Sequence, residues 1–240
     1  MIENSVQMNI NLFCLPFAGA SAHSYHHLQQ SACEGLHIIP LELPGRGARF
    51  AEPLPGRLEA MVSDCYDHIK TMLQQPYAFY GHSMGALLAY LLLQQVAAEQ
   101  QPLPLHLFVS GFAGPSVAMT KARRETLQRQ ETVDRVQHLM GEAAAIFKTE
   151  AFRVLYEPVI RADLDALIQY EYRSAPPSPV PVTVFAGQDD TITIEESYAW
   201  GNETVWPVPV YRFKGGHQFW QQHSSSLLQL MKNHLKVASS

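Results

Sequence analysis

The sequence predicts an α/β fold in which a mostly parallel central sheet carries helices on both of its faces. Short apolar runs of strand length alternate along the chain with longer segments whose apolar residues recur at helical spacing. Hydrophobic residues make up 47% of the 240 residues and charged residues 16%, which is enough apolar surface to bury a large core. A chain of this length is expected to form one domain, spanning residues 1–240.

The individual elements follow from these patterns. The segments predicted as strands are 10–15, 36–41, 77–80, 105–110, 181–186 and 209–213. An amphipathic helix is predicted between Leu58 and Leu73, because apolar residues recur there at three- and four-residue steps. The segment 83–96 is apolar on nearly all sides and is therefore predicted as a buried helix, and 224–237 as the closing helix.

One region breaks the alternation of strands and helices. Residues from about 120 to 172 are polar and rich in helix formers, and they contain no convincing strand. We expect a helical insertion between two strands, placed where it could cover a binding site as a lid. The proline-rich connector 175–179 then returns the chain to the sheet.

Composition and termini exclude several classes of protein. The net charge of -5 gives no reason to expect a nucleic acid or an anionic membrane as partner. The longest apolar stretch, around 86–93, is too short to span a bilayer, and the first ten residues lack the features of a signal peptide. Three widely spaced cysteines form no metal-ligand pattern and fit reduced thiols. These features predict a cytoplasmic protein without a membrane segment.

The strongest chemical signal is the sequence GHSMG at residues 81–85. It fits the pattern G-x-S-x-G, follows a predicted strand and opens a predicted helix, which is the context of the nucleophile elbow of α/β-hydrolases. In this setting Ser83 is predicted to project above the sheet as a nucleophile. The backbone N–H of Met84 lies at the helix N-terminus, where it is free to stabilise an oxyanion.

A serine nucleophile needs a base, and α/β-hydrolases supply it from a loop after the last strand. His217 follows two glycines directly after the strand 209–213, so it is the predicted base. His223 and His234 also follow this strand, but they lie at the edge of or inside the last helix. His82 flanks the serine, with its side chain expected to point away from it. The cluster of His23, His26 and His27 is expected to be solvated surface and not a metal site, so no metal is predicted.

The acid of the triad comes from the loop after the strand 181–186. This loop contains Asp189 and Asp190, and either could orient His217 and stabilise its protonated form. Adjacent side chains point in different directions, so only one of the two can hold this bond. Spacing within the chain does not choose between them.

Taken together, these motifs resemble a known family, the external (type II) thioesterases that accompany polyketide and non-ribosomal peptide synthetases. The resemblance runs almost from end to end. It is carried by LPFAGAS at 15–21, LPGR at 43–46 with Arg49, GHSMGA at 81–86, Ser110-Gly111, IRAD at 160–163, the acid loop ending at Trp200, and GGH at 215–217. The nucleophile motif is shared by many hydrolases, whereas the Pro-Phe-Ala-Gly, Pro-Gly-Arg and Arg-Ala-Asp segments together are more specific.

The resemblance also favours one of the two aspartates. In the family the acid loop usually reads D-P-x-V, with a tryptophan eleven residues after the aspartate, and Asp189 fits both features with Ile192 and Trp200. Asp189 is therefore the predicted acid, although Asp190 stands where the family has proline. Ala20 is a second departure, since the family more often has glycine there.

The function implied by the resemblance is hydrolysis of acyl thioesters on the phosphopantetheine arm of carrier proteins, which removes stalled or aberrant acyl groups. The insertion at 120–172 would be a mobile lid, and the protein a monomer that needs no cofactor. His217 would activate Ser83, and the oxyanion would be held by the N–H of Met84 and by that of Phe17 or Ala18.

Other functions remain open from the sequence. A carboxylesterase or lipase would use the same triad on oxygen esters, and acyl transfer or cyclisation differs from hydrolysis only in the access of water. A non-catalytic module that binds carrier proteins is a further alternative, which the intact triad argues against. The acyl chain and the synthetase served are not encoded in any motif.

Overall fold

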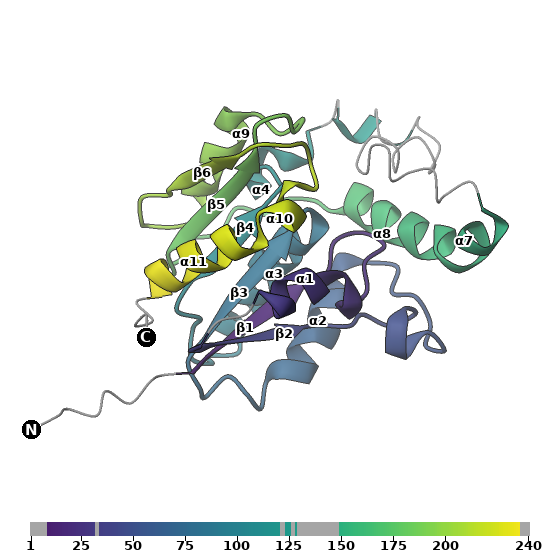
Figure 1. Ribbon diagram of the computed structural model, residues 1–240, viewed down its shortest axis with the longest axis horizontal. Helices are drawn as coiled ribbons and strands as arrows, with labels where there is room; N and C mark the ends of the chain where they lie inside the picture. Colours follow the sequence, from purple (N-terminus) through teal and green to yellow (C-terminus); the bar gives the residue numbers. More distant parts are fainter. Residues whose placement is uncertain (1–8, 32–33, 121–122, 126–127, 129–148, 236–240) are drawn as a thin grey trace, which may run out of the picture.

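A computed structural model shows a single sheet of six parallel strands between two layers of helices (Figure 1). It describes residues 9–31, 34–120, 123–125, 128 and 149–235. The strands are β1 (Ile10–Leu15), β2 (Leu36–Pro40), β3 (Tyr77–His82), β4 (Leu107–Ser110), β5 (Val182–Gly187) and β6 (Val210–Phe213). Their order across the sheet is β2-β1-β3-β4-β5-β6, and every neighbouring pair is parallel.

Helical segments connect these strands. In chain order they are η1 (Ala22–Tyr25), α1 (His26–Gln30), η2 (Gly47–Arg49), α2 (Leu58–Ile69), α3 (Met84–Ala98), α4 (Pro115–Ala118), α7 (Glu150–Leu155), α8 (Glu157–Gln169), α9 (Ile194–Tyr198), η4 (Ala199–Asn202), α10 (Phe219–Gln222) and α11 (Ser224–Leu235). The predicted α/β-hydrolase fold with a parallel sheet is thus confirmed. The strand boundaries differ from the predicted ones by no more than two residues, since strands fray into their turns.

Alternate side chains of the strands enter two separate cores. Phe13 and Leu15 of β1 point to the face covered by α2, α3 and α8, while Leu12 and Cys14 point to the face covered by α1, α10 and α11. This follows from the two-residue period of a strand, and it requires apolar residues at successive positions when both faces are covered. Helix α3 is buried nearly all round, as its sequence predicts, because it lies between the sheet and α2.

The strand order shows at which edge of the sheet a binding crevice can form. From β1 the chain moves outward to β2, then crosses back to form β3 on the other side of β1. In parallel sheets a crevice forms where such a reversal occurs, beyond the carboxyl ends of the two strands. The loop after β1 and the turn after β3 therefore meet at this point, and both carry predicted site residues.

Part of the predicted lid lies within the described residues. The insertion between β4 and β5 includes α4, α7 and α8, and α8 packs onto the core through Ile160, Leu164 and Leu167. The described part of the insertion is helical, as its composition predicts. Most of the segment 121–148 lies outside the described residues, so the role of the insertion as a lid stays a prediction.

Candidate active site

Ser83 occupies a strained backbone turn between β3 and α3. Its φ is 53° and its ψ -124°, a conformation that a residue with a side chain rarely adopts. The turn is held by the Ser83 N–H, which donates to the Ser110 carbonyl of β4 at 2.8 Å. The strain is tolerated because the surrounding strand and helix fix both ends of the turn.

The two glycines that flank the turn allow close backbone packing. A Cβ on Gly81 would lie 2.0 Å from the carbonyl oxygen of Gly85, and a Cβ on Gly85 would lie 2.2 Å from that of Leu15. Neither position has room for a side chain. The glycines of the motif thus bring the start of α3 against both β3 and the loop after β1, as expected for a nucleophile elbow.

The predicted base lies beside the predicted nucleophile. His217 Nε2 is 3.0 Å from the Ser83 Oγ, although the two residues are 134 positions apart in the sequence. The loop that carries His217 packs tightly on the loop after β5, where the Gln188 N–H donates to the Phe213 carbonyl at 2.8 Å. Of the other late histidines, His223 bonds the Lys214 carbonyl and His234 the Tyr211 hydroxyl, so neither occupies this position.

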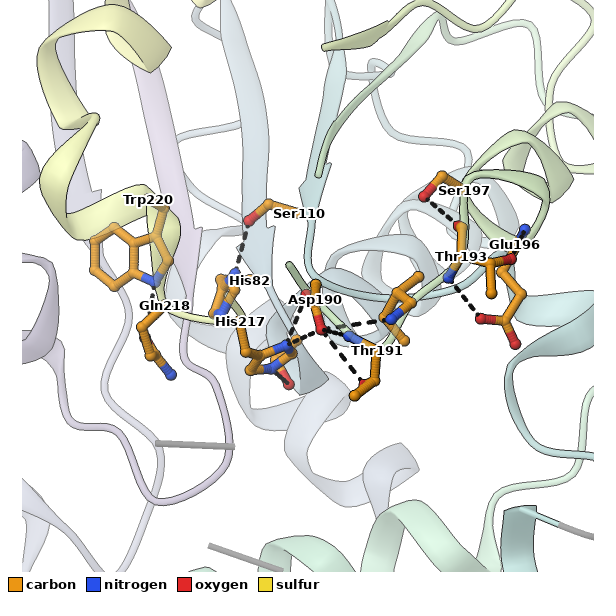
Figure 2. Close-up of polar contacts among 12 residues, drawn as sticks. His82, Ser110, Asp190, Thr191, Thr193, Glu196, Ser197, His217, Gln218 and Trp220 are labelled. Atoms are coloured by element: carbon orange, nitrogen blue, oxygen red, sulfur yellow. Dashed lines mark hydrogen bonds and ion pairs between the residues drawn. The ribbon is translucent and has the colours of Figure 1, made fainter. Parts of the chain in front are cut away.

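The acid predicted from the resemblance is wrong. His217 Nδ1 lies 3.0 and 3.2 Å from the two carboxylate oxygens of Asp190 (Figure 2). Asp189 is exposed, and its carboxylate accepts the Gly215 N–H at 3.3 Å. The tight turn after β5 sends the two neighbouring side chains in different directions. Asp189 therefore tethers the backbone of the histidine loop, while Asp190 orients the ring.

Asp190 is held as a carboxylate by its surroundings. Its side chain is 2% exposed, and this burial on its own would raise the pKa. The hydrogen bond and the charge of His217, together with the N–H groups of Thr191 and Ile192, oppose that effect and hold the pKa of Asp190 below its usual value. An ionised Asp190 is suited to stabilise a protonated His217.

A second histidine, His82, packs against the ring of His217. His82 is fully buried, and its ring centre is 4.9 Å from that of His217. Its Nδ1 lies 2.9 Å from the Ser110 Oγ (Figure 2). The same Oγ is 3.0 Å from the Tyr80 hydroxyl. Burial, and to a lesser degree the neighbouring His217, lower the pKa of His82 well below its usual value. His82 is thus a neutral ring that packs against His217 and contacts Ser110 through its Nδ1.

Backbone donors for an oxyanion are available near Ser83. Met84 is the first residue of α3, so its N–H has no partner within the helix. Phe17 and Ala18 lie in the loop after β1, which α3 contacts at Gly85. Within the described part of the chain, no acceptor bonds the N–H of any of these three residues. The arrangement leaves both Phe17 and Ala18 as candidates for the second donor.

Several residues at this site had no role assigned from the sequence. Ser110 and Gly111 belonged to the resemblance, but only the structure places them against the histidines: a Cβ on Gly111 would lie 2.5 Å from His82 and 3.2 Å from His217. Arg46 and Asp163, from two other motifs of the resemblance, form a buried ion pair. The proximity of these segments could not be read from the sequence, because it depends on strand order.

Among the described residues, no group of three or more His, Cys, Asp or Glu side chains could hold a metal ion. His23, His26 and His27 are exposed on η1 and α1, in agreement with the expectation of a solvated surface. No helix in the described ranges is long and apolar enough to cross a membrane.

Comparison with known proteins gives a consistent result. A family model described as "Thioesterase domain" matches residues 10–235. The gramicidin S biosynthesis protein GrsT of Aneurinibacillus migulanus is 27% identical over 229 residues, which cover 95% of this chain and 90% of GrsT. The chain spans nearly the full length of that relative.

Solved structures of similar proteins share the fold. The RedJ thioesterase from the prodiginine biosynthetic pathway in Streptomyces coelicolor superposes with a TM-score of 0.81 at 29% identity, covering 95% of this chain and 86% of RedJ. The type II thioesterase BorB from the borrelidin biosynthetic cluster superposes with a TM-score of 0.79 at 28% identity, covering 96% of this chain and 92% of BorB.

Proposed function

The chain belongs to the thioesterase domain family, and on this premise we propose that it is a type II thioesterase that removes acyl groups from the phosphopantetheine arm of carrier proteins by way of an acyl-Ser83 intermediate. The observation that carries the proposal is the continuous line of contacts from Ser83 through His217 to Asp190. The similarity to thioesterases of gramicidin, prodiginine and borrelidin biosynthesis supports the choice of substrate.

The first half of the reaction forms the acyl-enzyme. His217 Nε2 removes the proton of Ser83 as the Oγ attacks the thioester carbonyl, and Asp190 stabilises the imidazolium that results. The oxygen of the tetrahedral intermediate is held by the N–H of Met84 and by that of Phe17 or Ala18. When the intermediate collapses, the carbon–sulfur bond breaks and His217 returns the proton to the departing thiolate of the carrier.

The second half regenerates the enzyme. His217 takes a proton from water as the water oxygen attacks the acyl-Ser83 ester, and the same backbone donors hold the second oxyanion. Collapse releases the carboxylic acid and returns the proton to the Ser83 Oγ. The serine, the base and the backbone donors supply every step of this hydrolysis, so the mechanism uses no cofactor.

The decisive experiment compares three substrates that carry the same acyl group: a phosphopantetheinylated carrier protein, coenzyme A, and a matched oxygen ester. We expect release from the carrier to be fastest, and to fall by several orders of magnitude in Ser83→Ala, because removal of a triad nucleophile has this effect in related chemistry. Faster turnover of the oxygen ester with the carrier ignored would make the protein an esterase. Unchanged release by Ser83→Ala would contradict the assigned nucleophile.

A further inference from the structure

Arg46 and Asp163 form a buried ion pair that joins two distant parts of the fold. Arg46 lies in the loop after β2 and Asp163 in the middle of α8, with exposed side-chain fractions of 3% and 0%. The two side chains are bidentate, with Nη1–Oδ2 and Nη2–Oδ1 distances of 2.6 and 2.8 Å. Neither residue touches Ser83, His217 or Asp190 through any hydrogen bond, so the catalytic steps above do not account for the pair.

The pair also binds the loop after β1. The Gly19 N–H donates to Asp163 Oδ2 at 2.8 Å, so this carboxylate receives donors from two loops at once. The Arg46 Nη1 also points to the Ala20 carbonyl at 3.5 Å. The ion pair thereby contacts the loop after β1 at two points, the Gly19 N–H and the Ala20 carbonyl.

Helix α8 presses on the same residue. Gly19 has a φ of +77°, and a Cβ on it would lie 2.4 Å from Cγ1 of Ile160. Ile160 and Asp163 are three positions apart and so lie on one face of α8. The close approach of Ile160 and the hydrogen bond that Gly19 donates to Asp163 therefore fix the position of Gly19 against the helix.

Gly19 directly follows the two residues that are candidates for the second oxyanion donor. A short loop has few free torsions, so fixing the Gly19 N–H restricts where the N–H groups of Phe17 and Ala18 can point. The other end of this loop is held by the close packing of Gly85 on the Leu15 carbonyl. The loop is thus clamped at both ends around its oxyanion donors.

We propose that Asp163, itself held by Arg46, is a positioning residue that orients the oxyanion donor in the loop after β1. This inference rests on the proposed function, because it assumes that this loop supplies the donor. A buried ion pair is a poor way to gain stability, since its desolvation cost often equals its attraction and apolar replacements are frequently as stable. What an apolar pair could not supply is an acceptor for the Gly19 N–H.

Two double variants separate the acceptor from the ion pair. R46M/D163N and R46M/D163L both remove the buried charges, but only the asparagine keeps an oxygen that can accept the Gly19 N–H. We expect kcat of R46M/D163L to be roughly 10- to 100-fold below that of R46M/D163N, because a misplaced oxyanion donor costs this much in rate. The KM values of the two variants should agree within about threefold, since the donor acts on the transition state.

A transition-state analogue supplies a second readout. A trifluoromethyl ketone forms a tetrahedral adduct with the serine, and its oxyanion occupies the same donors. The affinity for this ketone should be lower in R46M/D163L than in R46M/D163N, by the same factor as kcat/KM. The affinity for an unreactive thioether analogue should be equal in the two variants. If Asp163 had a purely structural role, its substitution would not lower the affinities for the two ligands by different factors.

The matched control is the neighbouring pair of Arg49 and Asp64. It is also bidentate, with distances of 2.6 and 2.8 Å, and starts from the same loop, but the other hydrogen bonds of the Arg49 side chain go to Glu52 and the Glu42 carbonyl instead of to residues 17–20. R49M/D64L should keep kcat within about threefold of the unmodified enzyme. A loss of kcat equal to that of R46M/D163L would show a general effect of disturbing this loop and would overturn the proposal.

All rates are measured on a p-nitrophenyl ester as well as on the carrier thioester. If the unmodified enzyme ignores the carrier, the proposed function fails, yet the ester still tests the oxyanion donors. Equal kcat values for the two Arg46 double variants would overturn the inference. It would also be overturned if R46M/D163N folds while R46M/D163L does not, because the acceptor would then be needed for folding and not for catalysis.

Discussion

The carboxylate of Asp190 lies 3.0 Å from Nδ1 of His217, while the carboxylate of the preceding Asp189 turns away and accepts the Gly215 N–H. The two neighbouring aspartates thus serve the same histidine loop in different ways. Asp190 contacts the ring and is nearly fully buried, with 2% of its side chain exposed. Asp189 is exposed and ties the backbone of the loop to the turn after β5.

This arrangement predicts unequal effects of two matched substitutions. Asp190→Asn should lower kcat by about 10³- to 10⁴-fold, because an amide can neither stabilise the imidazolium nor select the correct tautomer of His217. Asp189→Asn should change kcat by less than about tenfold, since the amide oxygen can still accept the Gly215 N–H. Steady-state hydrolysis of an acyl thioester measures both. A larger loss in Asp189→Asn would return the role of acid to Asp189.

The Ser110 hydroxyl is expected to contribute to the stability of the fold next to the active site. Its hydroxyl serves two buried partners, His82 Nδ1 at 2.9 Å and the Tyr80 hydroxyl at 3.0 Å. Ser110→Ala leaves both without this partner and should lower the free energy of unfolding by about 1–3 kcal/mol. Urea denaturation measures the change, with Ser116→Ala as the control, since the Ser116 hydroxyl accepts an exposed hydrogen bond from Asn202. Equal stability of the two variants would contradict this role.

Buried histidines predict a loss of stability in acid. Burial, and then the nearby His234, lower the pKa of His106 to about 3, and the pKa values of His82 and His234 are lowered in the same direction. In the unfolded chain a histidine takes up a proton below about pH 6.5, whereas folded His106 does not. The stabilisation is therefore complete above about pH 6.5 and falls as the pH drops toward 3.

The contribution of His106 can be isolated with His106→Gln, which keeps a hydrogen-bonding group near Thr183. Between about pH 6 and 4 the slope of unfolding free energy against pH should become shallower by about 1.4 kcal/mol per pH unit, the effect of one proton. Above about pH 7.5 the difference between variant and unmodified protein should be constant, which serves as the internal control. Parallel curves in acid would show that His106 takes up its proton in the folded protein.

The two cysteines within the described ranges are expected to react slowly in the folded protein. Cys14 and Cys65 are buried, and burial raises the pKa of both thiols, that of Cys65 to about 12. Because the thiolate is the reactive form, iodoacetamide should not label either residue in the native state at about pH 8, yet should label both in denaturant. Peptide mapping by mass spectrometry distinguishes the sites. Rapid labelling of Cys14 in the native protein would be incompatible with its place in β1.

Much of the fold could be predicted because its signals are local. The strand β3, the pattern G-x-S-x-G and the apolar helix α3 follow one another within about twenty residues. A nucleophile elbow depends on backbone geometry, and glycine spacing encodes that geometry directly. The order of elements similarly predicted His217 in the loop after the last strand, and the structure brings it to 3.0 Å from Ser83.

The choice between Asp189 and Asp190 could not be made in this way. Both residues stand in the same loop, and family spacing favoured the first. Which carboxylate meets His217 depends on the direction of one tight turn. That turn is set by hydrogen bonds from the Gln188 N–H to Phe213 at the end of β6 and from the Asp189 N–H to Gly215 just after it. Those bonds join segments about 25 residues apart, so no local pattern reports them.

By itself, then, the sequence determined the fold class, the nucleophile motif and the position of the histidine loop, because each is written in consecutive residues or in the order of elements. Only the tertiary structure decided that Asp190 contacts His217, that His82 rests on Ser110, and that Arg46 and Asp163 meet at Gly19. These contacts join residues up to 144 positions apart. They exist because strand order brings separate loops to one edge of the sheet, and spacing along the chain carries no record of that order.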